Sequence, residues 1–207
     1  MNGYRTIAHE SEIEIVIKKS RFIGYAFLVS SAEEANEKLA ALRKRQWDAS
    51  HHCSAYVLGA DKQLQKYSDD GEPQGTAGMP ILQVLHHKDV TNTMVVVVRY
   101  FGGVLLGTGG LVRAYTTATA RALENAEVVT VRSVVELSVT VDYSLYERAS
   151  LLIDAAGAKQ AAPQFTDRVT LCWQMPEHTE GPLLEQLREL TRGGAQVHVS
   201  EPFYAPF

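Results

Sequence analysis

The stretch MVVVVRYFGGVLLGTGGLVRAY, residues 94–115, contains the three local patterns that decide the fold. Met94–Val98 is an unbroken apolar, mostly β-branched run, which predicts a central strand buried on both faces of a sheet. From Leu111 to about Glu127, apolar residues recur at helical spacing and predict a helix. Five glycines lie between this strand and this helix. Because glycine is costly to order, the connection requires a structural or functional reason.

The glycine-rich connection has the features of an anion-binding site. Free backbone amides at the start of a helix attract anions, and glycines let a phosphate approach the backbone closely. Arg99 and Arg113 flank the glycines and can add forked hydrogen bonds to such a group. The stretch matches neither the P-loop nor the dinucleotide-binding pattern, since Thr108 follows Gly107 and Val112 stands in place of the third glycine. The alternative is a tight connection that lets the helix pass close to the sheet.

Upstream of this stretch, the sequence predicts three further strands and two helices. Residues 12–18 alternate between apolar and charged side chains, which predicts a half-buried strand, and Arg21–Val29 predicts a second one. A capping box at Ser31–Glu34 opens a helix whose last turn is basic. His52–Gly59 predicts another strand, and Met79–His87 predicts a short helix.

From Val134 the pattern begins again and predicts a second domain. A helix is expected from Tyr143 to Ala156, and Lys159–Phe165 and Val169–Met175 are expected to form a hairpin. A strand is also expected at residues 134–142, a second helix at Glu180–Arg192 and a last strand at Ala195–Ser200. The predicted order β-α-β-β-α-β is the ferredoxin-like plan. The sequence therefore predicts an α+β fold of two domains, residues 1–133 and 134–207.

A second segment with candidate chemistry is SDDGEPQGTAGMP, residues 68–80. Asp69, Asp70 and Glu72 are clustered carboxylates, which can bind magnesium or position a water molecule. Asp, Gly and Pro are also turn-forming residues, so a solvated turn accounts for the same segment. Thr76 is a candidate cap for the following helix. In a third interpretation, one of the two aspartates pairs with an arginine of the glycine-rich connection, and neither loop needs a ligand.

The two cysteines limit the catalytic and metal chemistry. Cys53 and Cys172 are far apart in sequence, so neither a disulfide framework nor a four-ligand zinc site is expected. On a strand, His52 and Cys53 point to opposite faces, which predicts a buried thiol and no Cys–His nucleophile pair. No Ser-His-Asp order, HExxH or CxxC pattern is present. A binding protein is therefore favoured over an enzyme, and no catalytic residue, metal or cofactor is assigned.

The bulk composition favours a cytoplasmic protein with ordinary buried cores. The chain is 45% hydrophobic and 21% charged, with no apolar run long enough to span a membrane and no secretory h-region at its start. The net charge of -4 is not that of a nonspecific nucleic-acid binder. Residues 1–130 carry equal numbers of basic and acidic side chains, so that part can present a basic face.

Two segments together closely resemble the IMPACT family, in particular its bacterial YigZ/YvyE-like members. They are SDDGEPQGTAGMPIL (residues 68–82) and VVVVRYFGGVLLGTGGLVRAY (residues 95–115). HHCSAYVLG (51–59) and KKSRFIGYAF (18–27) are similar to earlier segments of the family, so the likeness covers essentially the whole chain. The resemblance implies a first domain similar to domain 2 of ribosomal protein S5, with a βαβα plan. It implies a second, ferredoxin-like domain similar to the carboxy-terminal domain of the translocation elongation factor.

The resemblance also implies a role in translation. Eukaryotic relatives regulate translation by restraining a kinase of an initiation factor, and the likenesses of the bacterial domains suggest binding to nucleic acid or to the ribosome. The candidate anion- or nucleic-acid-binding residues are Arg99, Tyr100, Gly102, Gly103, Gly107, Gly109, Gly110 and Arg113. The acidic loop of the family signature contributes Asp69, Asp70, Glu72 and Thr76.

Three functions are compatible with these residues. The favoured one is a noncatalytic protein of the translation machinery that binds RNA or the ribosome, with arginines on phosphates and Tyr100 or Phe101 stacked on a base. The second is an enzyme that acts on a phosphorylated small molecule or nucleotide, with Asp69 or Asp70 holding magnesium. The third is a regulator of translation that acts through protein–protein contacts, in which the two loops bind each other.

Overall fold

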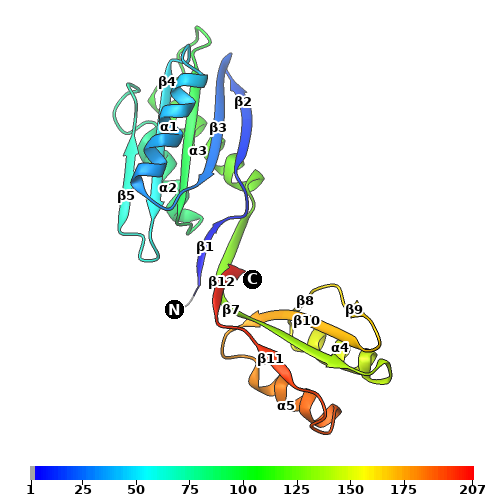
Figure 1. Cartoon of the computed structure of the whole chain (residues 1–207). Helices are drawn as coiled ribbons and strands as arrows, with labels where there is room; N and C mark the ends of the chain where they lie inside the picture. The colour runs from blue at the N-terminus through cyan, green and yellow to red at the C-terminus, as the bar shows by residue number, and fades with distance from the viewer. Residues whose placement is uncertain (1–2) are drawn as a thin grey trace. The chain divides into compact units, whose positions relative to one another are not determined.

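The computed structural model describes residues 3–207 (Figure 1). The chain divides into two compact units, residues 4–130 and residues 131–207 together with Gly3. The strand β7 (Val128–Val141) runs through the point of division, close to the predicted boundary after residue 133. The other elements of the first unit are β1 (Tyr4–Ile7), β2 (Ser11–Ile17), β3 (Ser20–Leu28), α1 (Ala32–Arg45), β4 (His51–Leu58), β5 (Leu64–Ser68), α2 (Gly78–His87), β6 (Thr93–Tyr100) and α3 (Thr108–Asn125).

The first unit is built on a five-stranded sheet in the order β2-β3-β6-β4-β5. Its paired strands are antiparallel. β6 is the central strand, and its residues 95–98 are completely buried. The β-branched run therefore predicted the position of this strand correctly, because only a strand covered on both faces buries every side chain.

Helices cover both faces of this sheet. α2 and α3 pack on one face, in a core that includes Phe22, Val97 and Tyr115, and α1 covers the other face over Tyr25 and Val96 (Figure 1). Successive residues of β6 contribute to opposite cores, as the alternation of a strand requires. The connection from β6 to α3 therefore leaves the sheet on the face that carries α2.

The second unit has the predicted ferredoxin-like plan. Its elements are β7, α4 (Tyr143–Ala155), β8 (Lys159–Gln160), β9 (Gln164–Phe165), β10 (Val169–Pro176), α5 (Gly181–Leu190), β11 (Val197–Val199) and β12 (Phe203–Pro206). β7 pairs with β10 on one side and with β11 and β12 on the other. Apolar side chains from α4 and α5 pack with those of β7 and β10 around the buried Trp173, so this unit has its own core.

Four details of the elements differ from the sequence prediction, and the first is β1, a four-residue strand that was not predicted. The expected strand Lys159–Phe165 is two short strands, β8 and β9, since Pro163 between them has no amide to donate to a ladder. β12 was not predicted, and it pairs with residues 131–134 of β7. β5 was not predicted either, because its five residues are mostly polar and exposed.

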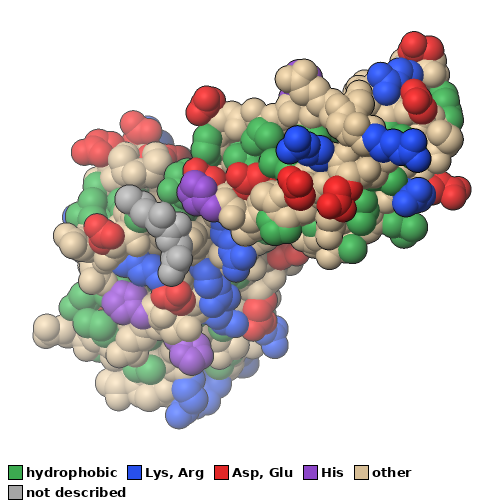
Figure 2. All heavy atoms as spheres, turned by 90° about the horizontal axis from the view of Figure 1, so that it is seen from below, with side chains coloured by type: hydrophobic (Ala, Val, Ile, Leu, Met, Phe, Trp, Pro, Cys, Tyr) green, Lys and Arg blue, Asp and Glu red, His purple; other side chains and the backbone are tan. Residues whose placement is uncertain are grey.

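No helix in residues 3–207 combines the length and apolar character needed to cross a membrane. On the face drawn in Figure 2, Lys and Arg side chains are interspersed with Asp and Glu.

Candidate functional site

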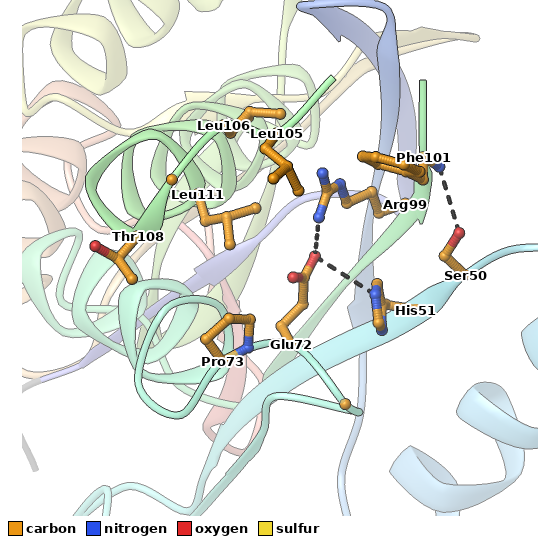
Figure 3. Close-up of a pocket in the computed structure, with 12 residues that line it drawn as sticks. Ser50, His51, Glu72, Pro73, Arg99, Phe101, Leu105, Leu106, Thr108 and Leu111 are labelled. Carbon is orange, nitrogen blue, oxygen red and sulfur yellow. Dashed lines mark hydrogen bonds and ion pairs between the residues drawn. The ribbon is translucent and has the colours of Figure 1, made fainter. Parts of the chain in front are cut away.

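A cavity of about 530 Å³ lies in the first unit, where the β6–α3 connection meets the loop after β5 (Figure 3). Polar groups at its inner end come from the ends of β4 and β6 and from the loop after β5, and apolar side chains form its walls. The lining residues are Ser50, His51, Gly71, Glu72, Pro73, Arg99, Phe101, Leu105, Leu106, Gly107, Thr108 and Leu111. The cavity therefore joins the glycine-rich and acidic segments that the sequence singled out.

A buried ion pair forms the inner end of the cavity. Arg99 Nη1 donates to Glu72 Oε1 at 2.6 Å, and the hydroxyl of Tyr115 donates to the same oxygen at 2.7 Å. Arg99 is 5% exposed and Glu72 is 8% exposed. Removing two charges from water is costly, so loss of either partner would leave the other as an uncompensated buried charge.

Strand register positions the basic side chains at this end. Arg99 lies opposite Phe22 on β3 and opposite His51 on β4, so the three side chains share one face of the sheet. The guanidinium lies 5.4 Å from the Phe22 ring centroid and 5.5 Å from that of Phe101. His51 Nε2 lies 3.9 Å from Glu72 Oε1. Two aromatic rings and a carboxylate thus hold Arg99 in one orientation.

The groups behind the ion pair stay protonated. Burial raises the pKa of the Tyr115 phenol and of the Cys53 thiol well above their ordinary values. Cys53 is completely buried, as the strand alternation predicted, and its thiol lies within hydrogen-bond distance of the Asp69 carbonyl and the Tyr115 hydroxyl. The neutral thiol is therefore part of the packing and is no nucleophile in this state.

The first turn of α3 lies at the rim of the cavity and has free amides. Gly107 is the N-cap residue, with φ of 74°, and it supplies no side-chain cap. The amides of Thr108, Gly109 and Gly110 donate to no group in residues 3–207. A Cβ added to Gly109 would meet only Arg113 Nη1, 3.9 Å away. The packing of the chain thus leaves open the space where a side chain at Gly109 would stand.

Arg113, in the second turn of α3, is an exposed cation next to Gly109. Its Nη1 approaches the position above Gly109, and the side chain makes no hydrogen bond or ion pair with any residue in 3–207. Arg99, in contrast, is committed to Glu72 inside the protein. The two arginines that flank the glycines therefore occupy different environments, and only Arg113 is free to meet a group from solvent.

Another glycine of the connection has a packing role. A Cβ on Gly102 would lie 2.1 Å from the backbone of Lys19, and the Gly102 amide donates to Ser20 Oγ. Gly103, with φ of 79°, has open space around it. The tight-connection interpretation thus accounts for Gly102 and also for Gly110, whose added Cβ would lie 3.0 Å from Leu106 Cβ, whereas it leaves the open position at Gly109 unexplained.

The acidic residues do not form one cluster. The Asp69 carboxylate accepts hydrogen bonds from the amides of Gly75, Ala77 and Gly78. It thereby caps the start of α2, a role predicted for Thr76. The Thr76 hydroxyl instead donates to the carbonyl of Pro73.

Asp70 points to yet another set of partners. Its carboxylate accepts from Arg43 Nη2 and from the amide of His52, each at 2.6 Å. The expected pairing of Asp69 or Asp70 with an arginine of the glycine-rich connection is therefore wrong in its residues: Glu72 makes that ion pair. Among residues 3–207, no three His, Cys, Asp or Glu side chains are grouped so as to hold a metal ion.

The two aromatic residues after Arg99 point in different directions. Tyr100 packs with the core under α1, and its hydroxyl donates to Asp48 Oδ1. Phe101 lines the cavity and is 50% exposed. Of the two predicted stacking residues, only Phe101 lies at the site.

Sequence reasoning missed His51 and the apolar wall. His51 belongs to the site because its register partner is Arg99, a relation between strands that are 48 positions apart in sequence. The Nδ1 of His51 lies 2.8 Å from the Asp70 carbonyl, which can only accept, so Nδ1 carries the hydrogen and Nε2 presents a lone pair when the ring is neutral. Leu105 and Leu106 gave no signal, since apolar loop residues are common in any sequence.

Family models match most of the chain. The Impact N-terminal domain matches residues 18–123, and the Domain of unknown function (DUF1949) matches residues 139–193. The two matches fall on the two structural units. The cavity and the start of α3 lie within the first match.

Relatives align over nearly the full length. IMPACT family member YvyE of Bacillus subtilis is 35% identical over 99% of this chain and 94% of its own length, and IMPACT family member YigZ of Escherichia coli is 36% identical over 87% and 90%. A solved structure described as that of a hypothetical protein covers 97% of this chain and 98% of its own, with a TM-score of 0.62 and 33% identity. A fungal relative, the Protein IMPACT homolog of Saccharomyces cerevisiae, is 33% identical over 45% of this chain. From the match over both units and the similarity of full-length relatives, we conclude that the chain belongs to the IMPACT family.

Proposed function

We propose that this chain is a noncatalytic, translation-associated protein that binds RNA, free or within the ribosome, through a phosphate at the start of α3. The observation that carries the proposal is the uncapped first turn at Thr108–Gly110, whose amides have no partner in residues 3–207. Three aligned amides and the helix dipole form an anion site of the kind that holds phosphates in many proteins. Arg113, one helical turn after Gly109, supplies a cation whose Nη1 approaches the space above Gly109.

The charge of the molecule favours a local contact over general attraction. The net charge is -4, and acidic and basic side chains are mixed on the face in Figure 2. Nonspecific RNA binding rests on many phosphate contacts and on a basic surface. We therefore expect few phosphate contacts, with affinity concentrated at α3 and its neighbouring cavity.

The test is Arg113→Ala, measured as RNA or ribosome binding by the full chain over a salt titration. Loss of one phosphate contact is expected to weaken binding across sequences and to make the slope of log K against log salt shallower by about one. Arg121→Ala is the matched control, because Arg121 is also exposed on α3 but lies about 12 Å farther along the helix. Equal effects of the two variants, or no effect of either, would contradict the proposal.

A protein partner is the second candidate, and exposed apolar side chains favour it. Leu105 is 82% exposed and Val104 is 39% exposed, beside the half-exposed Phe101. Capture from lysate with and without ribonuclease separates the two functions. Material that is lost after ribonuclease treatment supports RNA binding, whereas a protein that remains bound and depends on Leu105 supports the protein partner.

A further inference from the structure

A second pocket of the first unit, of about 230 Å³, lies between α1 and the strands β4 and β5. It shares no lining residue with the cavity at α3. Asn36, Leu39 and Arg43 form its helical side, since their spacing of three and four positions places them on one face of α1. The pocket is therefore a separate hollow on the face of the sheet that α1 covers.

Strand register gives the pocket its polar floor. Ser54 on β4 lies opposite Ser68 on β5, and Tyr56 lies opposite Lys66 two positions farther along. These four side chains share one face of the sheet, because paired residues and alternate residues of a strand point to the same side. Tyr56 belongs to the core under α1, which identifies that face. Register thus brings three hydroxyls and one ammonium group together.

Two of these hydroxyls belong to buried residues and have no protein partner. Ser54 and Tyr56 are each 7% exposed, and neither hydroxyl forms a hydrogen bond with any residue in 3–207. Neither oxygen is fully sealed from solvent. Buried polar groups are normally hydrogen-bonded, so a group that enters the pocket from solvent is needed to satisfy both hydroxyls.

The charges at the pocket are positive. The Lys66 ammonium makes no hydrogen bond or ion pair within residues 3–207. Arg43 donates to Asp70 through Nη2 alone, which leaves its other N–H groups uncommitted. Within the described part of the chain, no Asp or Glu lines the pocket. The lining therefore attracts an anion.

The size and the hydroxyls narrow the class of ligand. A volume of about 230 Å³ lies below the range of about 300–1,000 Å³ that is typical of sites for drug-sized molecules, so a small metabolite fits. Hydroxyl and side-chain amide groups both donate and accept hydrogen bonds, which matches the hydroxyls of a sugar. An anion with such a body is a sugar phosphate.

We propose that this pocket binds a sugar phosphate. Lys66 and the Tyr56 hydroxyl, which are register partners, hold the phosphate. The hydroxyls of Ser54 and Ser68, one pair farther along the strands, contact the sugar. The same chemistry is carried by a free sugar phosphate and by the phosphorylated 5′ end of an RNA. This site goes beyond the proposed function, since it uses no residue of the α3 site.

The test is a titration of the full chain with ribose 5-phosphate, followed by the amide chemical shifts in nuclear magnetic resonance. We expect saturable shifts at residues 54–56 and 66–68, and we expect them to persist in Arg113→Ala. Ribose and inorganic phosphate should each bind about tenfold more weakly, because each fills one half of the pocket. Shifts confined to the start of α3, shifts lost in Arg113→Ala, or no shifts would overturn the pocket.

Matched variants test the two halves of the site. Lys66→Gln should weaken both ribose 5-phosphate and inorganic phosphate about tenfold, because a charge-assisted hydrogen bond is lost. Lys44→Gln is the control, since Lys44 is exposed on α1 and does not line the pocket. Ser54→Ala should weaken ribose 5-phosphate and leave inorganic phosphate unchanged. Equal effects of the two lysine variants, or an unchanged affinity for ribose 5-phosphate in Ser54→Ala, would contradict the proposal.

An RNA tetranucleotide with a 5′-phosphate separates the two sources of the ligand. Tighter binding of the tetranucleotide than of ribose 5-phosphate, with loss in Lys66→Gln, identifies the RNA end as the ligand. Weaker binding identifies a free sugar phosphate. If Lys66→Gln changes the affinity of neither compound, the pocket is excluded, and the α3 site stands or falls by Arg113→Ala alone.

Discussion

At the residue scale, the site depends on the different environments of similar side chains. Arg99 is buried against Glu72 and cannot turn outward without leaving a carboxylate unpaired, whereas Arg113 is free on the surface. Asp69 and Asp70 serve backbone amides and Arg43. The sequence predicted one group of cations and one group of anions at the site. In the structure, most of these side chains instead have different partners.

The ion pair at the inner end of the cavity is expected to matter for stability. Arg99→Ala leaves the Glu72 charge buried without a cation, so the free energy of unfolding should fall by about 3–5 kcal/mol. Urea denaturation measures this change. Arg21→Ala is the control, since the Arg21–Glu14 pair is exposed and should contribute little. Similar losses for the two variants would show that the Arg99 pair is not desolvated in solution.

At the scale of elements, the residues at the start of α3 favour an open backbone over the stability of the helix. A helix gains stability from alanine or a capping side chain in its first turn, yet Gly107, Gly109 and Gly110 stand there. Gly107 is needed for its positive φ, whereas Gly109 has neither a positive φ nor a close neighbour. The free volume at Gly109 is explained if an anion approaches the backbone at that point.

Gly109→Ala should therefore separate stability from binding. Alanine lowers the entropy of the unfolded chain, so the free energy of unfolding is expected to rise by up to about 1 kcal/mol, while the added methyl group weakens RNA binding. Thermal unfolding and RNA titration measure the two effects. Gly181→Ala, at the open start of α5, should leave RNA binding unchanged, and it should give no comparable gain in stability because Pro182 disfavours a helical conformation for a preceding residue that carries a Cβ. A gain in both properties for Gly109→Ala would exclude close approach of a ligand.

At the scale of the whole molecule, the chain has two sets of cores that share no residue. Residues 4–130 form two cores, one on each face of their sheet, and residues 131–207 form a third around Trp173. The candidate site uses residues of the first unit alone.

Separate cores predict separate unfolding transitions. Ile153→Val in the second unit and Ile81→Val in the first each remove one buried methylene, at a cost of about 0.5–1.5 kcal/mol. In differential scanning calorimetry, each variant is expected to lower only the transition of its own unit by several degrees, about 4–8 °C per kcal/mol for a small unit. A single transition with equal calorimetric and van't Hoff enthalpies, shifted alike by both variants, would show one cooperative molecule.

The sequence by itself determined the elements that follow local rules. The β-branched run marked the central strand of the first sheet, the restart at Val134 marked a second α+β unit, and the glycines marked an open helix start. These features are readable because periodicity, capping and backbone freedom depend on neighbouring residues alone. β5 and β12 were missed because pairing with other strands, and not their own composition, makes them strands.

Only the tertiary structure decided which side chains meet. His51 reached the cavity through its register with Arg99, and Glu72 rather than Asp69 or Asp70 became the partner of that arginine. No local rule contains this information, because the contacts join positions 27 or more residues apart. Local sequence set where the chain turns and where amides stay free, and the packing of the sheet against α2 and α3 set which charges were buried together.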